Sequence, residues 1–198
     1  MIAILALQGA FAEHQQMLRR LGVESTLIRN LDDWMQYVSS LSDGNRGGLI
    51  IPGGESTTMM RIIQDERLFS PIREAILGGL PVLGTCAGLI MLDPAHLDTM
   101  RITVRRNAYG RQLGSFRTYG PFRGITDDPS LPEDRRTLPM TFIRAPFIES
   151  VAPEVEILAV VDNHIVAARH GNQIVTAFHP ELDDDTRIHE FFLRLVNS

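Results

Sequence analysis

One stretch, residues 80–92, restricts the possible folds of this chain more than any other. It combines a short apolar strand, a run of small residues and the start of a helix. The run reads Gly-Thr-Cys-Ala-Gly from residue 84 to residue 88, and Cys86 at its centre is the single cysteine of the protein. Glycines two positions before and after a nucleophile are typical of the strained strand-to-helix turn that presents a reactive side chain at the end of a sheet.

Cys86 has two interpretations. A helix that begins directly behind it would stabilise its thiolate through the free amides and positive end of the helix. The alternative is a small buried side chain, which is the usual role of a lone cysteine. The motif by itself favours neither interpretation. The presence of a base elsewhere in the chain therefore decides between them.

A candidate base lies near the other end of the chain, in Phe-His-Pro-Glu at residues 178–181. Residues 173–178 predict a strand, and residues two apart in extended chain point to the same face, so His179 and Glu181 should project together. The intervening proline favours this extended geometry. A base oriented by a carboxylate is what a cysteine nucleophile requires. We therefore predict a catalytic triad of Cys86, His179 and Glu181 rather than a solvated loop.

Hydrophobic patterns before the elbow alternate between strands and helices. Residues 2–7, 23–28 and 49–51 predict strands, and residues 12–21 and 30–41 carry apolar side chains at helical spacing. This βαβαβ order indicates a parallel sheet with helices on both faces. We predict an α/β three-layer sandwich around a mostly parallel, twisted sheet.

The pattern is less regular after the elbow. Residues 101–106 and 140–148 predict strands, whereas residues 107–112 are turn-like and residues 118–139 predict an exposed excursion. Arg144 interrupts an apolar strand, so it should meet a carboxylate or reach the surface. Three further strands with tight turns predict antiparallel pairing in the C-terminal half, and residues 183–196 predict a closing helix.

The third strand leads into Pro-Gly-Gly-Glu-Ser-Thr-Thr at residues 52–58. Glycines at the carboxyl end of a strand let backbone amides approach a ligand, in the crevice where open α/β sheets bind ligands. An amide of this loop, paired with that of Ala87, would form an oxyanion hole. A plain helix start with a Ser or Thr cap is the simpler alternative. A phosphate-binding loop is excluded because its lysine is missing.

Composition limits the classes of function. The chain has 198 residues, 44% of them apolar, which predicts a single domain over residues 1–198. A net charge of −5 argues against nucleic acid, and no apolar run is long enough to span a membrane. The lone cysteine fits the reducing cytoplasm, and no cluster has metal-ligand spacing. All 19 basic residues are arginine, so a lysine imine is impossible here.

These motifs, in this order, resemble those of class I (triad) glutamine amidotransferases. Further segments resemble the glutaminase subunits of pyridoxal 5′-phosphate synthase, and the similarity covers nearly the whole chain. The segments are residues 7–10 with 13–14, 104–112, 142–146, and 178–182 with 185–189. The main departure is residues 117–138, which are longer and more irregular than usual.

The resemblance implies a flavodoxin-like fold and hydrolysis of L-glutamine to glutamate and ammonia through a thioester, without a cofactor or metal. The ammonia would pass to a (β/α)₈-barrel synthase subunit. The amides of Gly54 and Ala87 would form the oxyanion hole. The residues implied to contact glutamine are Gly54, Glu55, Ser56, Arg106, Ile143 and Arg144. The arginines would bind either the glutamine α-carboxylate or Glu55.

Three alternatives stay open at this stage. The chain could be a glutaminase that serves another synthase, although residues 106–112 argue against this. It could be a different cysteine hydrolase of similar fold. It could also be a binding or regulatory subunit without catalytic activity, although the complete set of Cys86, His179 and Glu181 argues against that.

Overall fold

The computed structural model describes residues 1–41, 46–106 and 114–198. Its strands are β1 (Ile2–Leu5), β2 (Ser25–Ile28), β3 (Gly48–Ile51), β4 (Val82–Thr85), β5 (Ile102–Arg105), β6 (Ser115–Gly120), β7 (Leu138–Ile143), β8 (Phe147–Val151), β9 (Glu156–Val161), β10 (His164–His170) and β11 (Gln173–Thr176). Its helices are α1 (Phe11–Arg20), α2 (Leu31–Ser40), α3 (Ser56–Asp65), α4 (Phe69–Leu77), α5 (Ala87–Met91) and α6 (Arg187–Asn197), with 3₁₀ turns η1 (Glu133–Arg135) and η2 (Pro180–Leu182).

Within these segments one sheet runs in the order β2-β1-β3-β4-β11-β10-β8-β5, with β9 added beside β10. The half from β2 to β11 is parallel, and β10, β8, β5 and β9 pair antiparallel. Strands β1, β3, β4 and β11 are buried at every position, which is why they read as continuous small and apolar runs. Because these strands are parallel, their carboxyl ends meet at one edge of the sheet.

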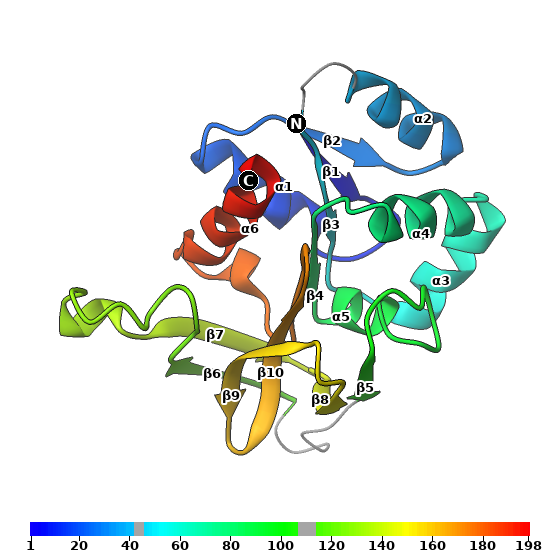
Figure 1. The fold of residues 1–198 in the computed structure, drawn as a ribbon. Helices are drawn as coiled ribbons and strands as arrows, with labels where there is room; N and C mark the ends of the chain where they lie inside the picture. Colours follow the sequence, from blue (N-terminus) through cyan, green and yellow to red (C-terminus); the bar gives the residue numbers. More distant parts are fainter. Residues whose placement is uncertain (42–45, 107–113) are drawn as a thin grey trace.

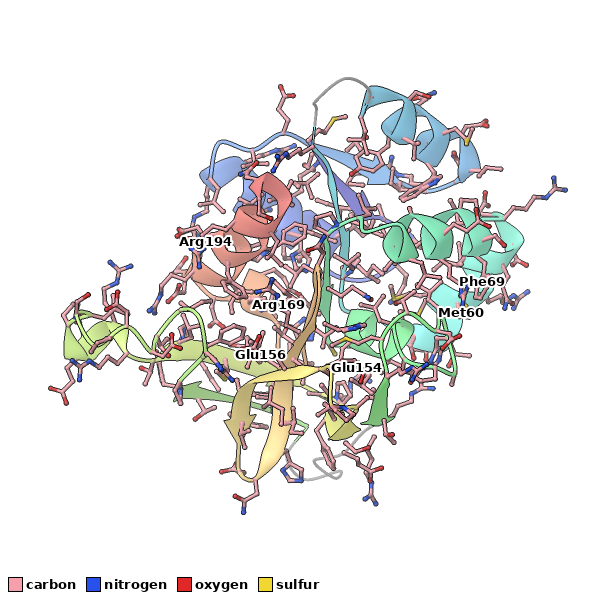
Figure 2. All side chains as sticks on the ribbon, viewed as in Figure 1. Met60, Phe69, Glu154, Glu156, Arg169 and Arg194 are labelled. Atoms are coloured by element: carbon pink, nitrogen blue, oxygen red, sulfur yellow. The ribbon has the colours of Figure 1, made fainter. Side chains whose placement is uncertain are left out.

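Helices cover both faces of the parallel half. Figure 1 shows α1 and α6 on one side and α2, α3, α4 and α5 on the other. Side chains fill the layers between sheet and helices (Figure 2). Local sequence explains where the helices lie: His14, Met17 and Leu18 of α1 are buried at helical spacing, and the Asn30 side chain caps α2 by accepting a 2.9 Å hydrogen bond from the Asp33 amide.

The prediction that residues 118–139 form an exposed excursion is wrong at both ends of the segment. β6 and β7 pair as an antiparallel ribbon in which Phe116 stacks on Phe142. Just beyond β6, Phe122 is fully buried and meets Phe191 of α6 edge to face, at 5.9 Å between ring centroids. Apolar anchors therefore hold both ends of the segment, because burying an aromatic ring outweighs the loop-forming tendency of nearby proline and charge.

Two other predictions need correction. The predicted strand at 140–148 is broken into β7 and β8 at Arg144, whose φ of 43° is left-handed and whose side chain is exposed. Helix α4, which follows α3 after a short turn, was not predicted. The turn predicted at residues 107–112 lies outside the described residues. No helix of the described segments is long and apolar enough to cross a bilayer.

Candidate active site

The elbow at Cys86 has the strained geometry that its glycines predict. Cys86 joins β4 to α5 with φ 50° and ψ −102°, and its amide donates a 2.8 Å hydrogen bond to the Thr176 carbonyl of β11. A Cβ on Gly88 would lie 2.0 Å from the Ile51 carbonyl oxygen, and one on Gly84 would lie 2.7 Å from the carbonyl oxygen of Gly88. Only glycine fits at these two positions, so the backbone contacts hold the thiol in place.

His179 and Glu181 form the pair that the sequence predicts, but by a different local geometry. The Nδ1–H group of His179 donates to Oε1 of Glu181 at 2.7 Å, and both side chains are buried. The prediction of an extended His-Pro-Glu segment is wrong, since residues 180–182 form the 3₁₀ turn η2. That turn folds the carboxylate back towards the imidazole. The His179 amide donates to the Thr141 carbonyl of β7 at 2.8 Å, which anchors the segment.

Electrostatics around His179 favour its charged form. Burial alone lowers its pKa, but hydrogen bonding to the Cys86 and Glu181 side chains outweighs burial and raises the pKa of His179 to about 10. Burial raises the pKa of Glu181, and the hydrogen bond from His179 opposes that effect. These hydrogen bonds therefore favour an imidazolium at His179.

The loop after β3 packs directly against these groups. A Cβ on Gly53 would lie 2.3 Å from Cε1 of His179, and one on Gly54 would lie 2.5 Å from Oε1 of Gln8. The same Gln8 oxygen accepts a 2.6 Å hydrogen bond from the Glu55 amide. A side chain at Gly53 would therefore displace the His179 ring, and Gln8 fixes the loop beside the thiol.

A cavity of about 460 Å³ opens between the elbow, this loop and the ribbon of β6 and β7. The sequence-predicted residues that line it are Gly54, Glu55, Ser56, Cys86, Ala87, Arg106, Ile143, Arg144 and His179. Glu181 lies behind His179 and does not line the cavity. The structure thus brings together residues that the sequence spreads over more than 120 positions.

Comparison with known proteins identifies the family of the chain. The model of the SNO glutamine amidotransferase family matches residues 4–198. The chain belongs to this family. It is 55% identical to pyridoxal 5′-phosphate synthase subunit PdxT of Streptococcus pneumoniae strain CGSP14, over 100% of this chain and 97% of the relative. Its identity to the PdxT of S. pneumoniae serotype 2 strain D39 is 54%, over 100% of this chain and 98% of that one.

Solved structures confirm the predicted fold class. A crystal structure described as a glutamine amidotransferase matches with a TM-score of 0.83 at 33% identity, covering 100% of this chain and 99% of that one. A glutamine amidotransferase from Thermotoga maritima matches with a TM-score of 0.59 at 15% identity, covering 99% of this chain and 83% of that one. The second likeness concerns the fold alone.

The two arginines at the cavity of this amidotransferase have different surroundings. Glu55 caps α3, and its pKa is lowered to about 2, first by the hydrogen bond from the Thr58 amide. Arg106 donates to Oε1 of Glu55 at 3.1 Å. Arg144 makes no ion pair with a described residue. The sequence left open whether the arginines bind the glutamine α-carboxylate or Glu55. In the structure, Arg106 is the partner of Glu55.

Sequence reasoning missed part of the cavity wall. The additional lining residues are Gln8, Gly9, Ala10, Gly53, Ile90, Pro146 and Leu182. Gln8 and Gly9 lie in the loop between β1 and α1, so the rule that ligands bind at the carboxyl ends of parallel strands could have found them. Pro146 and Leu182 carry no such signal, because only the tertiary fold brings them to the cavity.

Two buried histidines, to which the sequence assigned no role, predict how stability depends on pH. Burial lowers the pKa of His14 well below 6.5 and that of His189 to about 4. The unfolded chain therefore binds more protons than the folded protein between pH 6.5 and 4. We expect the free energy of unfolding to be highest near pH 6.5 and to fall towards pH 4, with a contribution of about 1.4 kcal/mol per pH unit from each histidine.

Urea unfolding at pH 7, 6 and 5 measures this slope. The raised pKa values of His179 and Glu181 act in the opposite sense: that of His179 above pH 6.5, outside this window, and that of Glu181 from pH 4.5 upwards, where it makes the net decline shallower. A His189→Asn variant should show a shallower decline than the wild type. Equal unfolding free energies at pH 7 and pH 5 would contradict the prediction.

Proposed function

We propose that this amidotransferase hydrolyses L-glutamine to L-glutamate and ammonia through a thioester on Cys86. The observation that supports this most directly is that Cys86 and His179 line one cavity, with Glu181 hydrogen-bonded to the imidazole and buried behind it. A nucleophile, a base and a carboxylate that orients the base are the components of acyl transfer.

In the first step the Cys86 thiolate attacks the side-chain carboxamide carbon of glutamine, and a carbon–sulfur bond forms. His179 then gives its proton to the departing nitrogen as the carbon–nitrogen bond breaks, which releases ammonia. In the second step His179 takes a proton from water, and the resulting hydroxide hydrolyses the thioester to glutamate and free thiolate. Glu181 holds the imidazole in orientation and stabilises its charge throughout.

Two backbone amides are proposed to bind the oxyanion, those of Gly54 and Ala87. Both residues line the cavity beside Cys86, one from the loop after β3 and the other from the start of α5. Amides held by the fold need no reorganisation when charge develops on the carbonyl oxygen, so they stabilise the tetrahedral intermediate effectively.

The rest of the glutamine would be recognised at the mouth of the cavity. We assign its α-carboxylate to Arg144, because the guanidinium of Arg106 already pairs with Glu55. The Glu55 carboxylate, with its lowered pKa, stays charged and can face the α-ammonium group. Ser56 and Ile143 complete the wall around the aliphatic part of the ligand.

The partner is proposed from the relatives, which carry the name pyridoxal 5′-phosphate synthase subunit PdxT. We infer that residues 1–198 form one glutaminase domain that delivers ammonia to a (β/α)₈-barrel synthase subunit in the cytoplasm, without a cofactor of its own. A chain without lysine agrees with this division, since imine chemistry then belongs to the partner.

Ammonia release from L-glutamine tests the proposal, measured with the purified chain alone and then with a pyridoxal 5′-phosphate synthase barrel subunit. We expect the barrel to increase the rate, and a glutamine-analogue alkylating agent to add one equivalent to Cys86. If the barrel subunit leaves the rate unchanged, the proposed glutaminase reaction stands. The proposed partner is then rejected in favour of another synthase. No activity and no alkylation would identify a non-catalytic binding subunit.

A further inference from the structure

A buried polar cluster lies directly behind the proposed triad, outside the cavity. It joins four side chains that are fully or nearly fully buried: His14 of α1, Thr85 of β4, Glu181 of η2 and His189 of α6. Nδ1 of His14 lies 2.9 Å from Nε2 of His189, and Nε2 of His14 lies 3.1 Å from Oγ1 of Thr85. The two imidazoles therefore connect two helices to the residue that precedes the nucleophile.

The cluster meets the triad at Glu181. Oε1 of Glu181 accepts from His179, whereas Oε2 is buried and accepts no hydrogen bond within the described residues. Nε2 of His14 lies 3.4 Å from this Oε2. Because a buried carboxylate oxygen without a donor is costly, a donor at that nitrogen would be drawn to it.

The contacts decide which nitrogen of His14 carries the proton. If Nδ1 were protonated it would donate to His189, whose own proton would then sit on Nδ1, a buried position without a partner among the described residues. The bare Nε2 of His14 would also face the carboxylate. With the proton on Nε2, His14 can donate to Thr85 and Glu181, and its Nδ1 accepts from His189. The second arrangement gives the ring N–H group of each histidine a partner, whereas the first leaves that of His189 unpaired.

We propose that His14 is a positioning residue of the triad: its Nε2–H group holds the Glu181 carboxylate so that Oε1 stays aimed at His179, and His189 fixes the tautomer of His14. The low pKa of both buried imidazoles keeps them neutral, so His14 acts as a hydrogen-bond donor and not as a second charge. This inference rests on the proposed function, because it assigns His14 to the same reaction.

Replacement of His14 by three residues separates positioning from packing. His14→Phe keeps the ring volume and removes the donor, His14→Gln places an amide N–H near the position of Nε2, and His14→Asn places one only near Nδ1. With the barrel subunit present, we expect His14→Phe and His14→Asn to lower kcat about 10- to 100-fold with KM within about twofold of the wild type. His14→Gln should recover most of that loss.

A double-mutant cycle with Glu181→Gln tests whether His14 acts through the carboxylate. Added to Glu181→Gln, the His14→Phe change should lower kcat by less than about threefold, because the group it positions is already gone. If the His14→Phe variant does not fold, the same cycle is measured with His14→Asn. His96→Phe is the matched control, since His96 also contacts a carboxylate, Asp93 at 2.7 Å, but does not line the cavity.

Three results would overturn the inference: wild-type kcat in His14→Asn, no recovery in His14→Gln, or a full 10- to 100-fold loss on top of Glu181→Gln. A merely structural role would produce the last of these, because independent effects multiply. A wild-type protein that releases no ammonia would instead refute the proposed function, so the two failures are distinguishable.

Discussion

Replacement of Cys86 by alanine should abolish ammonia release from L-glutamine, with a loss of about a millionfold that places activity below detection. The physical reason is that no other thiol is available: Cys86 is the single cysteine, and the cavity presents its sulfur beside His179 and the proposed oxyanion amides. Without the thiolate no carbon–sulfur bond can form, and the imidazole has nothing to activate except water.

The measurement is single-turnover and steady-state ammonia release by the Cys86→Ala variant in complex with the barrel subunit. The control is binding of glutamine by calorimetry, which should persist because the residues proposed to contact its α-groups are unchanged. Thermal unfolding should shift little, since the substitution removes one small side chain. Ammonia release at the wild-type rate by this variant would refute the thioester mechanism.

Glu181→Gln should lower kcat about 10³- to 10⁴-fold while KM changes little. The amide is nearly the same size as the carboxylate, but it carries no charge to stabilise the imidazolium and can present an N–H group to His179. Its 2.7 Å contact with Nδ1 is the one that sets the ring orientation. The acid–base steps are therefore lost while the glutamine site remains.

Asp93→Asn is the matched control for this variant. Asp93 also contacts an imidazole, that of His96, at 2.7 Å, but neither residue lines the cavity. We expect the control to lose stability without losing more than about threefold in kcat. Equal losses of activity in Glu181→Gln and Asp93→Asn would show that general destabilisation explains the result, and would remove Glu181 from the mechanism.

The parallel half of the fold was predictable because its signals are local. Burial on both faces makes β1, β3 and β4 continuous small and apolar runs. The residues around Phe122 carry opposite signals: proline and charge predict a loop, whereas the ring itself is a core residue. Which signal prevails depends on whether α6 is there to cover the ring.

The sequence alone determined the α/β class, the elbow at Cys86, the pairing of His179 with Glu181 and the glycine loop, because each depends on the residue types within a few positions. The tertiary structure alone decided that His-Pro-Glu adopts a 3₁₀ turn, that Gln8 holds the loop after β3, and that His14 and His189 meet behind Glu181. These contacts join residues that are 47 to 175 positions apart. No local pattern encodes such contacts, because they arise when separate helices and strands pack on one sheet.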